Sequence, residues 1–194
     1  MSEEREPSLP GSVSMVSLVV VFWMYVILFA VIGAMRGWAR ELLVSFALIL
    51  ALFIISVLER FVPFIQAIAT TSPPTMFWLR TGVVLALVFF GYQTPNIPRL
   101  SAQNRFARER LQDILLGVFL GAFNGYLVVG TIWFYLNAAG YPFPNLIESP
   151  PFGSQLAETT ARMMALMPPD LLGGSSAIYF AVALAFAFVL VVFI

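Results

Sequence analysis

GAMRGWAREL, residues 33–42, is a short polar segment between two long apolar runs. Residues 13–32 carry no charge before it, and residues 43–58 carry none after it. An apolar run of about 20 residues is long enough to cross the ~30 Å hydrocarbon core of a bilayer as a helix. The segment therefore predicts a turn between two antiparallel membrane helices.

The composition of the whole chain agrees with a membrane protein. Of 194 residues, 60% are hydrophobic and only 10% are charged, whereas a soluble domain has about 25% charged residues. Ten basic residues balance ten acidic ones, so the formal net charge is +0. A neutral chain lacks the strongly basic character of nucleic-acid-binding domains, and we expect no nucleic-acid partner.

Three residue types are missing, and their absence excludes several kinds of chemistry. The chain has no Cys, no His and no Lys. Disulfides, thiolate nucleophiles and Fe–S clusters are thereby excluded, as are the usual haem ligand and the lysine of Schiff-base enzymes. The remaining Asp and Glu residues lie almost entirely at the ends of the apolar runs. We therefore expect no enzymatic activity, no cofactor and no metal site.

Apolar runs and breaks predict an all-α bundle of about five transmembrane helices, made of a four-helix core and a C-terminal span. Four helices with a detachable C-terminal anchor is the alternative. A short amphipathic interfacial helix is expected over residues 154–167, with Leu156, Met163 and Met167 on one side. The expected spans are residues 13–35, 42–58, 76–92, 114–136 and 177–194. The expected units are an acidic tail at 1–12, the core at 13–138, a loop with the amphipathic helix at 139–173, and the last helix at 174–194.

The distribution of arginine predicts the orientation in the membrane. With five spans, the 33–41 turn and the 93–113 loop share one face, which carries six arginines against four on the other. The richer face is expected to be cytoplasmic, with the N-terminus outside and the C-terminus inside. Four of these arginines stand beside apolar residues next to a span and are expected to bind anionic lipid headgroups. They are Arg99, Arg105, Arg108 and Arg110.

The polar turn itself has two interpretations. In the first, Gly37 ends the first helix with a positive φ, Arg36 faces the negative end of the helix dipole, and Arg40 contacts lipid phosphates. In the second, Arg40 and Glu41 dock against another helix and lock the hairpin. A further charge, Arg80, lies one turn inside the third span; it either extends to the interface or pairs with Glu59 or Glu41.

Three glycines at four-residue spacing predict a helix–helix contact. In GVFLGAFNG, Gly117, Gly121 and Gly125 leave one helix face flat, so that a second backbone can approach closely. Gly33 in the first span offers a complementary face. Asn124 lies among these glycines near mid-span, where a polar side chain usually bonds to a neighbouring helix; a substrate or ion pathway is the alternative.

Three segments together resemble the CvpA family, the colicin V production proteins: RGWARELL, RERLQDILLGVFLGAFNGYLVVG and SPPFGSQLAETTARMMALMPP. The resemblance covers roughly residues 20–170. The family often has an acidic residue where this chain has Met24 and Tyr25, and an arginine where it has Asn124. The positions that match are Arg36, Gly37, Arg40, Glu41, Gly117, Gly121 and Gly125.

The resemblance implies a bacterial inner-membrane protein linked to peptide-toxin export and envelope maintenance, without a catalytic site. We therefore expect a non-enzymatic protein that acts through helix packing, with the bilayer and a membrane protein or a second copy as partners. The first alternative is an accessory or scaffolding subunit of a respiratory or photosynthetic complex, in which the many aromatic residues would contact carotenoid or quinone. A small transporter or channel is the third hypothesis for the function.

Overall fold

The computed structural model describes residues 18–93, 107–143, 147, 149–151, 153–173 and 176–193. The regular structure of these residues is entirely helical, so the expected all-α class is confirmed. The N-terminal tail at 1–12 lies outside them. The helices are α1 (Leu18–Arg36), α2 (Trp38–Phe61), α3 (Pro63–Thr71), α4 (Pro73–Tyr92), α5 (Ala107–Ala138), α6 (Gln155–Met164), α7 (Pro168–Gly173) and α8 (Ala177–Phe193).

Four of the described helices are long and apolar enough to cross a membrane: α1, α2, α4 and the Arg110–Ala138 part of α5. They correspond to the four runs expected for the core. The largest difference is in α5, which begins at Ala107, seven residues before the expected span at 114. Its first two turns contain charged residues, so hydropathy marks only the apolar part of a longer helix.

Glycine and proline mark the breaks between successive helices. Gly37 is the single residue between α1 and α2, and its φ of 85° is a conformation that glycine adopts readily. Val62 separates α2 from Pro63, and Ser72 separates α3 from Pro73. Each proline begins the next helix, where its missing N–H removes no hydrogen bond.

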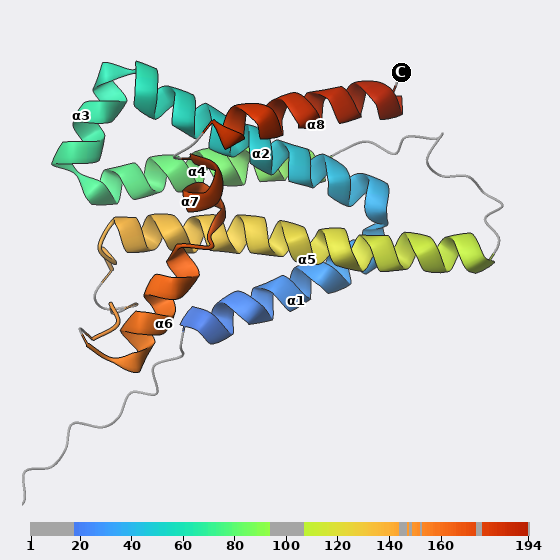
Figure 1. The fold of residues 1–194 in the computed structure, drawn as a ribbon, viewed down its shortest axis with the longest axis horizontal. Helices are drawn as coiled ribbons and strands as arrows, with labels where there is room; N and C mark the ends of the chain where they lie inside the picture. The colour runs from blue at the N-terminus through green and yellow to red at the C-terminus, as the bar shows by residue number, and fades with distance from the viewer. Residues whose placement is uncertain are drawn as a thin grey trace, which may run out of the picture.

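Helix α5 lies between α1 on one side and α2 and α4 on the other (Figure 1). Apolar side chains form a cluster on each side of it. The larger cluster joins α5 to α2 and α4 through residues such as Leu48, Val84 and Val128. The smaller one joins α5 to α1 through Trp133 and Phe22, and the chain around α6 enters it through Met164 and Met167. Because α1 packs mainly on α5, only 17% of its span is buried, against 44% for the span in α5.

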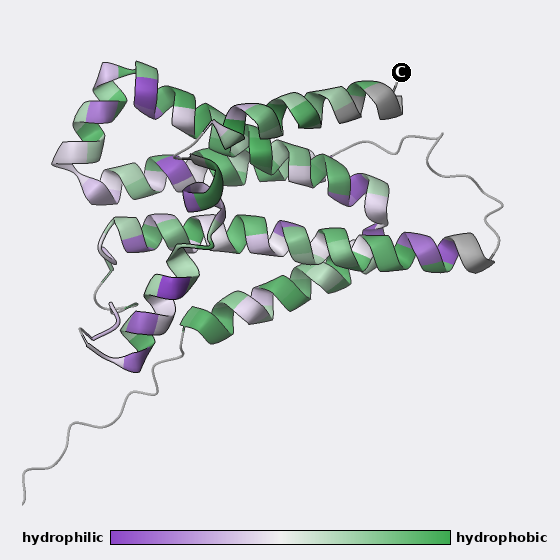
Figure 2. Ribbon diagram, in the orientation of Figure 1, coloured by the Kyte–Doolittle hydropathy of each residue, from purple (hydrophilic) through white to green (hydrophobic). Residues whose placement is uncertain are grey.

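Polar residues gather at the two ends of the bundle, with apolar turns between them (Figure 2). The amphipathic helix expected over 154–167 is present as α6, and the Ser154 hydroxyl accepts a hydrogen bond from the Ala157 N–H at 3.1 Å. Met167 is buried just after the helix ends, and Met163 packs against the smaller apolar cluster, as expected. Leu156 differs, because it is 40% exposed, whereas Thr160 and Met164 are the buried residues of α6.

Helix α8 starts part-way along the bundle. Its Tyr179 ring packs edge-on against Phe53 of α2, with 5.9 Å between centroids, well before α2 ends at Phe61. From there α8 runs antiparallel to α2 toward the α1–α2 turn (Figure 1). Its 17 residues correspond to about 26 Å of helix, less than the ~30 Å hydrocarbon core. A fifth span therefore stays a prediction.

Candidate functional site

The backbones of α1 and α5 touch along a glycine seam, made of Gly33 in α1 and Gly117, Gly121 and Gly125 in α5. A Cβ atom added at Gly33 would lie 2.7 Å from the Cα of Gly121, and one at Gly117 would lie 3.0 Å from the carbonyl carbon of Gly33. A Cβ at Gly125 would lie 2.8 Å from the Cβ of Phe29. Any side chain along the seam would therefore push the two helices apart.

The glycine seam brings α5 close enough to the α1–α2 turn for Asn124 to reach Glu41 in the first turn of α2. The Asn124 amide nitrogen donates to the Glu41 carbonyl oxygen at 2.8 Å and to Oε2 of its carboxylate at 2.9 Å. The Ser45 hydroxyl donates to Asn124 Oδ1 at 2.7 Å. Glu41 and Asn124 are both 0% exposed, so these bonds form in an apolar interior.

Arg36, the last residue of α1, neutralises this buried carboxylate. One terminal nitrogen of its guanidinium donates to Glu41 Oε1 at 2.8 Å, and the other donates to the Tyr92 carbonyl oxygen at 3.1 Å. The guanidinium also lies over the Tyr92 ring, 4.2 Å from its centroid. Because Tyr92 ends α4, the cluster of Arg36, Glu41, Ser45, Tyr92 and Asn124 (the Glu41 cluster) connects α1, α2, α4 and α5.

A second carboxylate stabilises the turn from the α5 side. The Trp38 N–H donates to Asp113 Oδ1 at 3.4 Å, and a Cβ added at Gly37 would lie 3.1 Å from that same oxygen. A negative charge at the first turn of α2 is favoured by the helix dipole. Gly37 therefore combines a positive φ with close approach of a neighbouring side chain. Arg36 is expected from the sequence to face the negative end of the α1 dipole. In the structure, its guanidinium also donates to the Glu41 carboxylate.

The hydrogen bonds of the Glu41 cluster fix the positions of α1, α2, α4 and α5 relative to one another. Both carboxylate oxygens of Glu41, the Asn124 amide and both terminal nitrogens of Arg36 have partners within the chain. The three cavities described below are lined by other residues. Removing one partner of a buried ion pair costs about 3–5 kcal/mol, so the cluster strongly favours one arrangement of the four helices.

The remaining arginines of the expected site occupy less central places. Arg40 is half-buried in the first turn of α2 and has an interaction partner in the structure. Arg110 is exposed near the start of α5, and Arg108 belongs to the same helix, although its side chain is outside the described part. Arg99 and Arg105 lie outside the described residues. Their contact with lipid headgroups stays a prediction.

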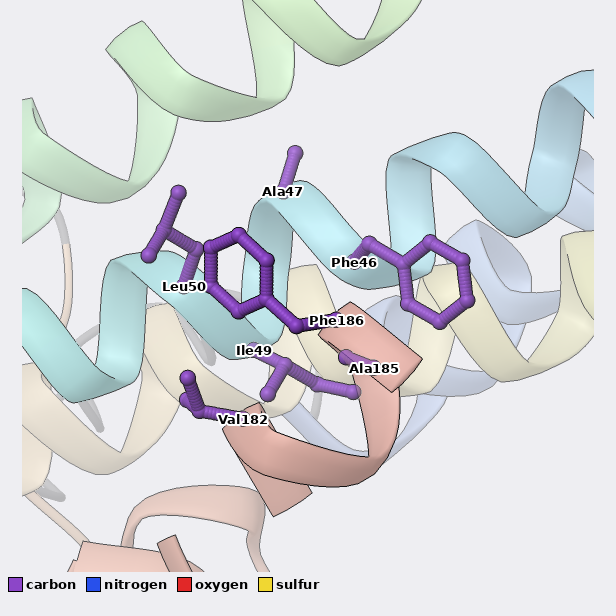
Figure 3. A pocket seen from close by; sticks show the side chains of 7 residues that line it. All are labelled: Phe46, Ala47, Ile49, Leu50, Val182, Ala185 and Phe186. Atoms are coloured by element: carbon purple, nitrogen blue, oxygen red, sulfur yellow. The ribbon is translucent and has the colours of Figure 1, made fainter. Parts of the chain in front are cut away.

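Elsewhere, the described residues line cavities of which three bear on the expected ligands. A groove of about 150 Å³ between α2 and α8 has walls of hydrocarbon only, including Phe46 and Phe186 (Figure 3). These walls offer a quinone head group no side-chain hydrogen bond. A cavity of about 350 Å³ toward the far end of α2 has a mixed lining of charged and apolar residues that includes Arg80. One of about 420 Å³ lies between the end of α5 and α6.

Three members of this arrangement are absent from the sequence-based expectation: Ser45, Tyr92 and Asp113. Ser45 had a usable signal, because it follows Glu41 by four residues and so lies on the same helix face. The sequence gives no comparable indication for Tyr92 and Asp113. Each flanks the polar stretch between two spans, where polar residues are common. Among the described residues, no three Asp, Glu, His or Cys side chains lie together as metal ligands would.

Comparisons of the chain with family models, with curated proteins and with solved structures gave no match. The resemblance to the CvpA family therefore stays a prediction.

Proposed function

We propose that this chain is a non-enzymatic integral membrane protein that acts through helix packing and through contacts with lipid and with a protein partner in the bilayer. The observation that carries the proposal is the Glu41 cluster. The charged and amide groups of Arg36, Glu41 and Asn124 bond to one another and to neighbouring backbone, and so hold four helices together. The Tyr92 hydroxyl is buried without a hydrogen-bond partner among the described residues. A catalytic or transport site would present its charged groups to a substrate.

The surface of α1 supports the second half of the proposal. Large apolar side chains such as Trp23, Ile27 and Val31 are more than half exposed, and within the described structure α1 is held mainly by α5. Lipid covers such a face in a membrane. We propose a role in export or envelope maintenance in a bacterial inner membrane, as the CvpA resemblance implies, with a membrane protein or a second copy as partner.

Extraction in mild detergent, followed by reconstitution, tests this function. We expect native mass spectrometry to show the chain in a stoichiometric complex with another protein or with a second copy. We also expect liposomes that contain the purified chain to leak protons and K⁺ no faster than protein-free liposomes, because Arg36, Glu41 and Asn124 bond to one another.

Three results would contradict the proposal. A strictly monomeric chain would remove the partner, and a substrate turned over by the chain alone would make it an enzyme. Ion flux that is lost on Asn124→Leu would establish the transporter alternative. Stoichiometric extraction with a pigment-bearing or redox complex would instead identify the partner as a bioenergetic assembly, and the chain as its accessory subunit.

The proposed orientation can be tested by cysteine labelling, because the chain has no cysteine of its own. Thr71 ends α3 and Gln93 follows α4, so the two positions lie at opposite ends of a span. In spheroplasts, we expect an impermeant maleimide to label Thr71→Cys at once and Gln93→Cys only after permeabilisation. The reverse order would place the arginine-rich end outside, and labelling of both would contradict the span in α4. The unmodified chain serves as the blank.

A further inference from the structure

A second ion pair lies at the opposite end of the bundle from the Glu41 cluster. Arg80, in the second turn of α4, donates from Nε to Glu59 Oε1 of α2 at 2.7 Å. Its guanidinium carbon lies 5.1 Å from the centroid of the Tyr135 ring in α5. The side chains of Arg80 and Glu59 are 20% and 32% exposed, so this pair is partly accessible, unlike the fully buried Glu41.

The ion pair leaves most of the hydrogen-bonding capacity of Arg80 unused. Arginine has five N–H donors in a planar fork, and the contact with Glu59 uses Nε. Within the described structure, the two terminal nitrogens of Arg80 have no hydrogen-bond partner of their own. The Tyr135 ring supports one side of the guanidinium and limits its movement. A fixed fork of this kind matches the paired oxygens of a phosphate or carboxylate.

Arg80 helps to line a cavity of about 350 Å³ between α2, α4, α5 and α7. Arg60 and Arg80 contribute two positive charges to its lining and Glu59 one negative charge, which gives a net charge of +1. The opposite walls are apolar, with Leu52, Ile55 and Phe134 among them. A charged rim next to apolar walls suits a ligand that joins an anionic group to a less polar stem.

We propose that this cavity binds a phosphate group carried on a glycerol or acyl-glycerol stem. The charged residues of the cavity lie near the end of α2 and the start of α4, which meet at one end of the bundle (Figure 1). In a chain that crosses the bilayer, we expect this end to lie at the level of the lipid headgroups. The net positive charge selects an anion, the fork of Arg80 selects paired oxygens, and the apolar walls accept the stem. The inference needs only the membrane location of the chain, and it holds whether or not the chain has a protein partner.

Native mass spectrometry of the purified chain in neutral detergent tests the proposal. The probes are phosphatidylglycerol, a phosphate-free diacylglycerol galactolipid, and glycerol 3-phosphate. We expect phosphatidylglycerol to bind one molecule per chain at least tenfold more tightly than the galactolipid. Binding of glycerol 3-phosphate with similar strength would identify a free phosphate ester as the natural source, whereas binding of phosphatidylglycerol alone would identify a membrane lipid.

Variants separate the proposed site from a general effect on folding. Arg80→Lys retains the positive charge near Glu59 but removes the fork, and we expect affinity for phosphatidylglycerol to fall about tenfold, as for the loss of one charge-assisted hydrogen bond. Glu59→Gln removes the competing carboxylate, and we expect equal or tighter binding. If the ion pair only held the helices together, Glu59→Gln would loosen the cavity, and the variant would bind phosphatidylglycerol more weakly.

The matched control is Arg162→Gln. Arg162 lies in α6, its side chain is 83% exposed, and it is outside the lining of the cavity. We expect this variant to bind phosphatidylglycerol as the unmodified chain does. The proposal is overturned if the galactolipid binds as tightly as phosphatidylglycerol, if Arg80→Lys binds normally, or if Arg162→Gln loses as much affinity as Arg80→Lys.

Discussion

Gly121→Leu is expected to break the contact between α1 and α5 and to leave little folded protein. A Cβ atom at this position would already lie 2.9 Å from the Cα of Gly33. That Cα belongs to the backbone of α1, which has no side chain there that could move aside. Overpacking at a rigid contact costs about 3 kcal/mol. The loss would include the apolar cluster between α1 and α5, since its members meet only when the glycine seam is closed.

The measurement is the monodisperse fraction in mild detergent, together with the midpoint of unfolding in a denaturing detergent. Gly82→Leu is the control, because Gly82 is exposed in α4 and an added Cβ has nothing within 4 Å. That variant should be as stable as the unmodified chain. Gly121→Ala should fall between the two. Equal stability of Gly121→Leu and Gly82→Leu would show that the glycine seam is not needed for folding.

Part of this contact could be predicted from the sequence because glycine spacing has a direct geometric meaning. Residues four apart share a helix face, so Gly117, Gly121 and Gly125 had to form one flat strip. The length of the apolar runs likewise predicted the four membrane helices, because a bilayer has a nearly constant thickness. Both inferences depend on local sequence and on the solvent, and neither requires knowledge of the tertiary structure.

The Glu41 cluster could not be derived in the same way. Asn124 and Glu41 are 83 residues apart, and a polar side chain in a span has many partners available until the crossing of the helices is known. The position of α8 is similar. Its apolar composition indicates a membrane environment, but its starting point beside Phe53 depends on how α7 packs against α2 and α5.

Glu41→Ala is expected to destabilise the bundle almost as strongly as the glycine substitution. Arg36 would lose the carboxylate at 2.8 Å, and the Asn124 amide would lose one of its two acceptors in a fully buried position. Breaking a buried pair costs about 3–5 kcal/mol; we expect the lower end, because the Arg36 side chain is 19% exposed. Glu41→Gln keeps one acceptor oxygen and removes only the charge and the second acceptor, so it should cost less.

The unfolding midpoint in a denaturing detergent measures this effect. Two further variants show whether the loss comes from the buried ion pair. Glu158→Ala removes a carboxylate from an exposed pair, with 3.8 Å between Glu158 and Arg162, and should change stability by less than about 1 kcal/mol. The double variant Arg36→Met, Glu41→Leu removes both charges and fills the space with hydrocarbon, so it should recover much of the loss. Because the penalty comes from an uncompensated charge, a double variant no more stable than Glu41→Ala would contradict the ion-pair explanation and leave the Asn124 hydrogen bonds as the main contribution.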